Sequence, residues 1–250
     1  MKFNLVIICA VGSIYFVESS NLFQLSYHYS ITSQAVADFI FNVYLNDTPT
    51  VNICSAPIND NQKLVMDDLI NEIIMQSESV FQIEQYTFLN ASNQKRFHNV
   101  ILIGNYDSFR QIYNCLLAEN FVYQGYFLFV LVDYYSEQYV EMTQALEDLW
   151  QIYIVNVNIL MRSPLNNVMD MYTYYPFTQS YCGKVFPVLI NQFINTEFKI
   201  AGNYFVDTLS NMHQCSLKVA TFNIPPLMMV EFTQDSFKLT GIEGYLLQGN

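Results

Sequence analysis

Apolar residues recur along the first 160 residues at two spacings, and segments of the two kinds alternate. Helical spacing predicts helices over 31–45, from Asn59 or Asp60, from Asp107 or Ser108, and over 137–150. Continuous or alternating apolar runs predict strands over 50–54, 80–89, 100–103, 126–132 and 152–160. Thr32 or Ser33 is expected to cap the first helix. This order predicts βαβ units, and hence an α/β domain over 20–175 with a largely parallel sheet and helices on both faces.

The pattern changes after residue 175. Residues 176–214 have no firm period, and we predict a connector there. Leu217, Val219 and Thr221 alternate like a strand that Pro225-Pro226 would end, and 228–232 predicts another strand. Residues 241–247 predict a turn that enters a helix. We expect 215–250 to be the incomplete start of a further domain, because one turn of helix has no partner to bury it.

The N-terminus has the pattern of a secretory signal. Lys2 precedes an apolar run over 3–17, and Val17-Glu18-Ser19 provides a cleavage motif, so we predict a signal peptide over 1–19 and cleavage before Ser20. An uncleaved anchor is the alternative. Later runs, of which 126–132 is the strongest, are shorter than the roughly 20 residues of a membrane-spanning helix.

Composition is consistent with a folded, secreted chain. The formal net charge is -12 and no basic stripe is present, which argues against nucleic acid as a partner. Hydrophobic residues make up 52%, enough for a core, and we expect the 19 Tyr and 20 Phe to be mainly core and sheet residues rather than interface residues. Asn46 and Asn90 begin glycosylation sequons.

Candidate chemistry is sparse. His28, His98 and His213 share no motif, and we expect surface or half-buried positions for them. The acidic pairs Asp67-Asp68 and Glu147-Asp148 are expected on solvated helix faces. No phosphate loop, dinucleotide turn, nucleophile elbow or zinc spacing occurs, so we predict no catalytic residue, no metal site and no cofactor, and a protein that is not an enzyme. Four cysteines remain beyond the signal, which allows two disulfides in three connectivities.

Two C-terminal stretches resemble a known family. Residues 215–229 (CSLKVATFNIPPLMM) and 239–247 (LTGIEGYLL) are similar to the opening of the ligand-binding domain of ionotropic glutamate receptors. The residues before and after the strand, Asn211-Met-His-Gln-Cys215 and Pro225-Pro226-Leu227, resemble the divergent insect ionotropic receptors used in chemosensation. The upstream Tyr174-Tyr-Pro-Phe177 followed by Cys182 has the same resemblance.

The resemblance implies a domain plan and ligand-lobe residues. It implies an extracellular amino-terminal domain like one lobe of a periplasmic binding protein, then a connector, then the truncated first lobe of a glutamate-receptor-type ligand-binding domain. In the family, a ligand would approach Pro225, Pro226, Leu227, Glu243 and Gly244. Leu227 replaces an aromatic residue of the glutamate receptors, and the family's carboxylate-binding arginine and channel helices lie further downstream, so glutamate binding is not expected.

The resemblance also implies disulfides. It implies one between Cys182 and Cys215, which flank the connector, and one between Cys54 and Cys115. A buried thiol at Cys115 is the alternative to the second pair.

The function implied is that of the extracellular part of a chemosensory receptor. The complete receptor would be a ligand-gated cation channel in the plasma membrane, a tetramer with co-receptor subunits, opened by a small molecule. The present chain would be a fragment, a truncated isoform or an incomplete gene model. A secreted soluble binding protein is the main alternative. A secreted α/β hydrolase or transferase is a third, and would need clustered polar residues at strand ends near Gly104, Asp133 and Asn156.

Overall fold

The structure is a computed structural model that describes residues 30–44, 51–76, 82–83, 97–118, 124–133, 138–164, 167–202, 204–216, 223–232 and 237–242. The predicted signal peptide over 1–19 and both sequons, at Asn46 and Asn90, lie outside these residues. So does His28. These predictions therefore stay predictions.

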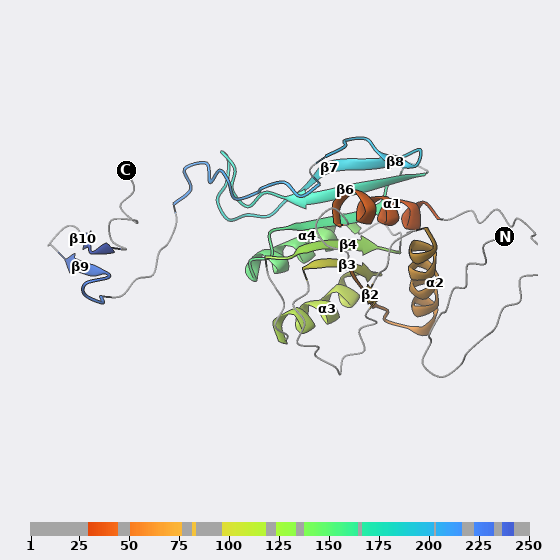
Figure 1. The fold of residues 1–250 in the computed structure, drawn as a ribbon, viewed down its shortest axis with the longest axis horizontal. Coiled ribbons are helices and arrows are strands. Elements are labelled where there is room, and N and C mark those ends of the chain that lie inside the picture. Colours follow the sequence, from red (N-terminus) through yellow and green to blue (C-terminus); the bar gives the residue numbers. More distant parts are fainter. Residues whose placement is uncertain are drawn as a thin grey trace, which may run out of the picture.

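One eight-stranded sheet forms the centre of the fold, with the strand order β2-β1-β3-β4-β5-β6-β7-β8 (Figure 1). The strands are β1 (Asn52–Ala56), β2 (Gln82–Ile83), β3 (His98–Ile103), β4 (Tyr126–Leu131), β5 (Val157–Arg162), β6 (Val168–Tyr174), β7 (Pro187–Ile194) and β8 (Glu197–Phe198). The first five are parallel, and β6, β7 and β8 add antiparallel pairings. The predicted α/β class with a largely parallel sheet is confirmed.

Helices cover both faces of this sheet, as predicted. The helical elements are α1 (Ile31–Phe39) with the π-helical turn η1 (Ile40–Tyr44), α2 (Asp60–Gln76), α3 (Tyr106–Ala118) and α4 (Gln138–Gln151). One buried cluster joins α1, η1 and α2 to the sheet, and a second joins α3 and α4 to the opposite face. Alternate residues of β4 supply both clusters: Leu128 and Val130 the first, Phe127 and Phe129 the second. None of the helices in the described part of the chain has the length and apolar character needed to cross a bilayer.

Polar side chains fix where the helices begin. The residue at the start of α2, Asn59, is one of the two predicted, whereas the caps of α1 and α3 lie two to three residues before the predicted ones. Ser30, rather than Thr32 or Ser33, caps α1, because its side chain accepts a hydrogen bond from the Ser33 amide. The Asn59 side chain accepts from the amide of Gln62 at the start of α2. At the start of α3, the Asn105 side chain accepts a hydrogen bond from the Ser108 amide, so Asn105 is the cap rather than the predicted Asp107 or Ser108.

Residues 152–156, predicted as the first half of a strand, instead end α4. The amides of Ile152 and Ile154 both donate to the carbonyl of Leu149, and Tyr153 has a φ of 60°. Strand β5 therefore starts only at Val157. Consecutive apolar residues alone do not distinguish this closing turn from a buried strand.

The segment predicted as a connector, 176–214, carries two more strands of the sheet. Strand β7 pairs with β6, and β8 pairs with β7. Beyond β8, Tyr204 and Phe205 are buried in the cluster that contains α1, and the Asn158 side-chain amide donates to the Tyr204 carbonyl. The sheet thus extends beyond residue 175. The domain boundaries at 175 and 214 stay a prediction.

The last described residues form an antiparallel hairpin of β9 (Met229–Phe232) and β10 (Phe237–Thr240). Strand β9 confirms the strand predicted over 228–232. The preceding predicted strand over 217–221 and the helix start after Ile242 lie outside the described residues.

A cluster of polar groups joins α3 to α4. Asp148 accepts a hydrogen bond from the Tyr106 hydroxyl at 2.7 Å and forms an ion pair with Arg110 at 2.9 Å. Burial and, second, the hydrogen bond to Asp148 raise the pKa of Tyr106 above its ordinary value. The backbone amide of Tyr106 donates to Glu141. The prediction that Asp148 is simply solvated was therefore wrong, since its side chain is only 15% exposed.

Replacing Asp148 with alanine should lower the free energy of unfolding by about 1 kcal/mol, because it removes one hydrogen bond and one partly exposed ion pair. Chemical denaturation of Asp148→Ala measures this. The matched control is Glu147→Ala on the exposed side of the same helix, with an expected change below about 0.5 kcal/mol. Equal losses in the two variants would contradict the role given to Asp148.

Candidate functional site

The carboxyl ends of the parallel strands lie at one edge of the sheet. Between β1 and β3, the direction in which successive strands are added to the sheet reverses. From β1 the chain passes through α2 to β2 at the edge of the sheet, whereas from β3 it passes through α3 to β4 on the opposite side of β1. The two helices leave on opposite faces of the sheet. In open α/β sheets, ligands bind in the crevice outside the strand ends at such a switch point.

Gln62, in the first turn of α2, connects three of these strand ends. Its side-chain amide donates to Asp133 after β4 at 2.6 Å, and its carbonyl accepts from the Ile58 amide after β1 at 2.8 Å. Gly104, directly after β3, leaves the space that Gln62 occupies. A Cβ at this position would overlap the Gln62 amide and lie 2.8 Å from Asp133 Oδ2.

Beside this junction is a cavity of about 540 Å³, on the sheet face that α1 and α2 cover. It lies between the start of α1, one face of α2 and the ends of β4 and β5. Its lining residues are Ser30, Thr32, Val65, Asp68, Leu69, Glu72, Val132, Asp133 and Arg162. We call it the strand-end cavity. Its volume is in the range of small-molecule sites.

The secondary structure determines which side chains reach the strand-end cavity. Val65, Asp68, Leu69 and Glu72 follow the i, i+3, i+4, i+7 spacing of one helix face. On β5, Arg162 shares a face with Leu160, a member of the cluster beneath α1 and α2.

In the described part of the chain, two pairs of lining residues contact each other through polar groups, in addition to the bond from Gln62 to Asp133. Glu72 accepts from the Ser30 amide at 3.2 Å and the Ser30 hydroxyl at 2.9 Å, which joins the start of α1 to α2. Nε of Arg162 lies 3.5 Å from the Thr32 hydroxyl oxygen, a weak hydrogen bond.

The residues named for a possible enzyme are only partly brought together. Gly104 and Asp133 lie at the carboxyl edge, but Asn156 precedes β5 and so lies at the opposite edge, where it donates to the Gln124 carbonyl. His98 is 2% exposed and stacked on Tyr126, contrary to the expected surface or half-buried position. Within the described residues, no three His, Cys, Asp or Glu side chains are placed to hold a metal ion.

The ligand-lobe residues predicted from the C-terminal motif do not line the strand-end cavity. Pro225, Pro226 and Leu227 are exposed in the turn that Ile224 and Met228 close, and the Pro225-Pro226 peptide is cis. Glu243 and Gly244 lie outside the described residues. Their role remains a prediction. Sequence analysis pointed toward the cavity only through the strand ends at Gly104 and Asp133. It expected Asp68 on a solvated helix face; Asp68 is exposed there and lines the cavity.

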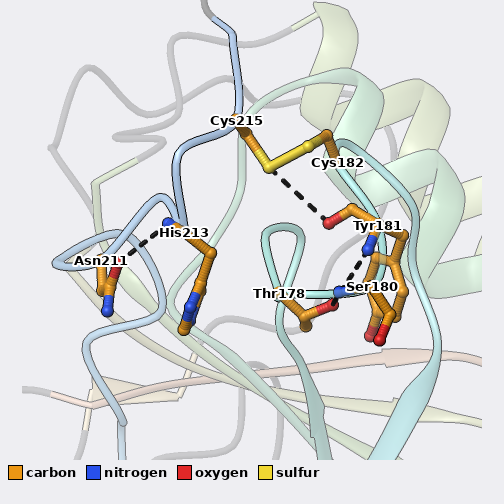
Figure 2. Close-up of a disulfide and its surroundings, with 7 residues drawn as sticks. All are labelled: Thr178, Ser180, Tyr181, Cys182, Asn211, His213 and Cys215. Carbon is orange, nitrogen blue, oxygen red and sulfur yellow. Dashed lines mark hydrogen bonds between the residues drawn. A yellow bond between two sulfur atoms is a disulfide. The ribbon is translucent and has the colours of Figure 1, made fainter.

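The disulfide between Cys182 and Cys215 is present, as predicted (Figure 2). Cys182 lies opposite Phe177 in a short β-bridge that leads into β7, and Cys215 follows the segment that leaves the sheet after β8. Figure 2 also shows the turn between Phe177 and Cys182, in which the Thr178 hydroxyl accepts from the amides of Ser180 and Tyr181. The disulfide therefore fastens the exit of the chain to the sheet.

The pairing of Cys54 with Cys115 remains a prediction. Cys54 is buried on β1, in the cluster that holds Ile112 and Leu116 of α3. Cys115 lies on α3, but its side chain is outside the described part of the structure. Helix α3 packs against β1, so both cysteines belong to adjacent elements.

Replacing Gly104 with alanine should cost about 1–2 kcal/mol of unfolding free energy, because the new methyl group displaces the Gln62 amide from its two hydrogen bonds. Gln62→Ala removes the same bonds directly and should cost a similar amount. In the double variant the two losses of unfolding free energy should not add, since alanine at position 62 has already vacated the space that the new methyl group enters. Chemical denaturation of all three variants measures this cycle. Strictly additive losses would show that Gly104 does not act by leaving space for the Gln62 side chain.

Removing the Cys182–Cys215 disulfide should lower the unfolding free energy by about 2–4 kcal/mol, since the bond closes a loop of sequence separation 33. The variant Cys182→Ala/Cys215→Ala, compared with the parent by thermal unfolding, measures the loss. Reductant should lower the melting temperature of the parent and leave that of the double variant unchanged. A parent insensitive to reductant would contradict a stabilising role.

A family model independently describes most of this chain. The model "Putative ionotropic receptor, ligand binding domain" matches residues 22–211, which include the whole eight-stranded sheet, the strand-end cavity and most of the predicted connector. No curated protein and no solved structure matches the chain. The matched residues cover well over half of the sequence, and the chain belongs to the ionotropic receptor ligand-binding-domain family.

Proposed function

We propose that the chain is the extracellular ligand-binding and assembly region of an ionotropic chemosensory receptor, which when complete is a ligand-gated cation channel. The observation that supports this best is the family match over 22–211, because the matched residues contain a cavity beside the switch point of an open α/β sheet, at the carboxyl ends of β4 and β5. In this proposal the strand-end cavity receives the ligand, and other segments of the receptor supply the pore.

The receptor assignment also includes partners and location. The complete receptor assembles as a tetramer with co-receptor subunits, with this region on the outer face of the plasma membrane. The predicted signal peptide at 1–19 and the disulfide at Cys182–Cys215 support a secretory route, since disulfides persist in oxidising compartments.

A ligand screen on the secreted chain tests the site. Small tastants and odorants are added, and the melting temperature is followed. A ligand at 100 times its Kd stabilises the folded state by about 2.7 kcal/mol, which gives a clear shift. Val65→Trp should abolish the shift, because Val65 lines the cavity and indole would fill it.

The control for this screen is Leu64→Trp. Leu64 is the exposed neighbour of Val65 on α2 and does not line the cavity, so the shift should persist. A ligand whose effect survives Val65→Trp binds elsewhere and would refute the site. A screen in which no compound shifts the melting temperature would refute the ligand-binding proposal.

The coding sequence separates a receptor from a secreted binding protein, the second candidate. In a receptor transcript the reading frame continues past Asn250 into apolar spans of about 20 residues. A stop codon there in every transcript would favour the secreted binding protein, for which the same cavity would serve.

A further inference from the structure

The lining of the strand-end cavity carries an excess of negative charge. It contains the three carboxylates of Asp68, Glu72 and Asp133 and one guanidinium, that of Arg162. Their formal charges sum to -2, from three negative groups and one positive group. A concave site of one sign concentrates ligands of the opposite sign.

Arg162 does not neutralise the carboxylates of Asp68 and Glu72. Its Nε makes a weak contact of 3.5 Å with the Thr32 hydroxyl, and among the residues that the structure describes it forms no ion pair with Asp68 or Glu72. Glu72 has two uncharged donors, both from Ser30. Within the described part of the chain, Arg162 therefore leaves the charges of Asp68 and Glu72 uncancelled.

Apolar side chains line the same cavity next to the carboxylates. Val65 and Leu69 alternate with Asp68 and Glu72 along one face of α2, and Val132 adds an apolar group at the end of β4. Side chains at i and i+3 are neighbours on a helix, so Asp68 lies beside Val65 and Glu72 lies beside Leu69. A ligand that contacts both would have a charged head and an apolar body.

We infer that the strand-end cavity binds a small organic cation, with its ammonium or guanidinium group near Asp68 and Glu72 and its apolar part against Val65, Leu69 and Val132. This inference rests on the proposed ligand-binding function and adds the chemical class of the ligand. Arg162, at the end of β5, disfavours a second positive group on that side, so the preferred ligand carries one positive charge.

Three probes of one shape test the charge preference on the secreted full chain: cyclohexylmethylamine, cyclohexylmethanol and cyclohexanecarboxylate. Calorimetric titration at pH 7 and low salt should show the amine binding about tenfold more tightly than the alcohol, and the carboxylate more weakly still. Added salt should weaken amine binding and leave alcohol binding unchanged.

Substitutions without change of size identify the carboxylates. Asp68→Asn and Glu72→Gln should each raise the Kd of the amine about threefold, as expected for partly exposed charge pairs, and Arg162→Gln should lower it. Glu147→Gln removes the same charge from α4, on the opposite face of the sheet, and should leave the Kd unchanged. Equal melting temperatures would show that the variants remain folded.

The outcomes separate the ligand class from the site. If the carboxylate probe binds most tightly and Arg162→Gln abolishes its binding, the cavity is a ligand site but the cation inference is wrong. Binding of all three probes with equal Kd, or amine binding unaffected by both Asp68→Asn and Glu72→Gln, would also overturn the inference. So would the absence of amine binding up to about 10 mM. The ligand screen with Val65→Trp tests the site itself separately.

Discussion

The central strands bury side chains on both of their faces, and the rest of the architecture depends on this. Every residue of β3 is buried, as are five of the six residues of β4. A strand of this kind needs apolar cover on each side, so successive crossover helices must be divided between the two faces. Helix α2 covers one face and α3 the other. Because crossovers are right-handed, this division reverses the strand order between β1 and β3 and creates the switch point.

At the switch point, backbone and side chains approach too closely for an ordinary residue. Gly104, at the end of β3, makes room for Gln62, whose side chain donates to Asp133 and accepts from the Ile58 amide and so joins the ends of β1 and β4. A nearly buried amide must have its partners, because leaving them unmade costs about 1–3 kcal/mol. The resulting edge supports the adjacent cavity, in whose lining Asp68 is exposed and Glu72 is half-buried.

The chain is held at two places as it leaves the sheet. Tyr204 and Phe205 pack with Phe39 in an aromatic cluster under α1, and the disulfide of Cys182 and Cys215 fastens the segment again a few residues later. Much of the high aromatic content is explained by such core contacts. In a receptor, this double attachment would transmit a displacement of the sheet to whatever follows residue 216.

The sequence by itself determined the class of fold, because hydrophobic periodicity reports the burial of each residue within its own element. The sequence also predicted the two-sided burial of β4 and one disulfide. It did not predict that β7 joins the sheet or that Asp148 accepts a hydrogen bond from Tyr106. Nor did it predict that Asp68 and Arg162 line one cavity. Those relations join residues distant in sequence. They depend on strand order and helix placement, so only the tertiary structure decided them.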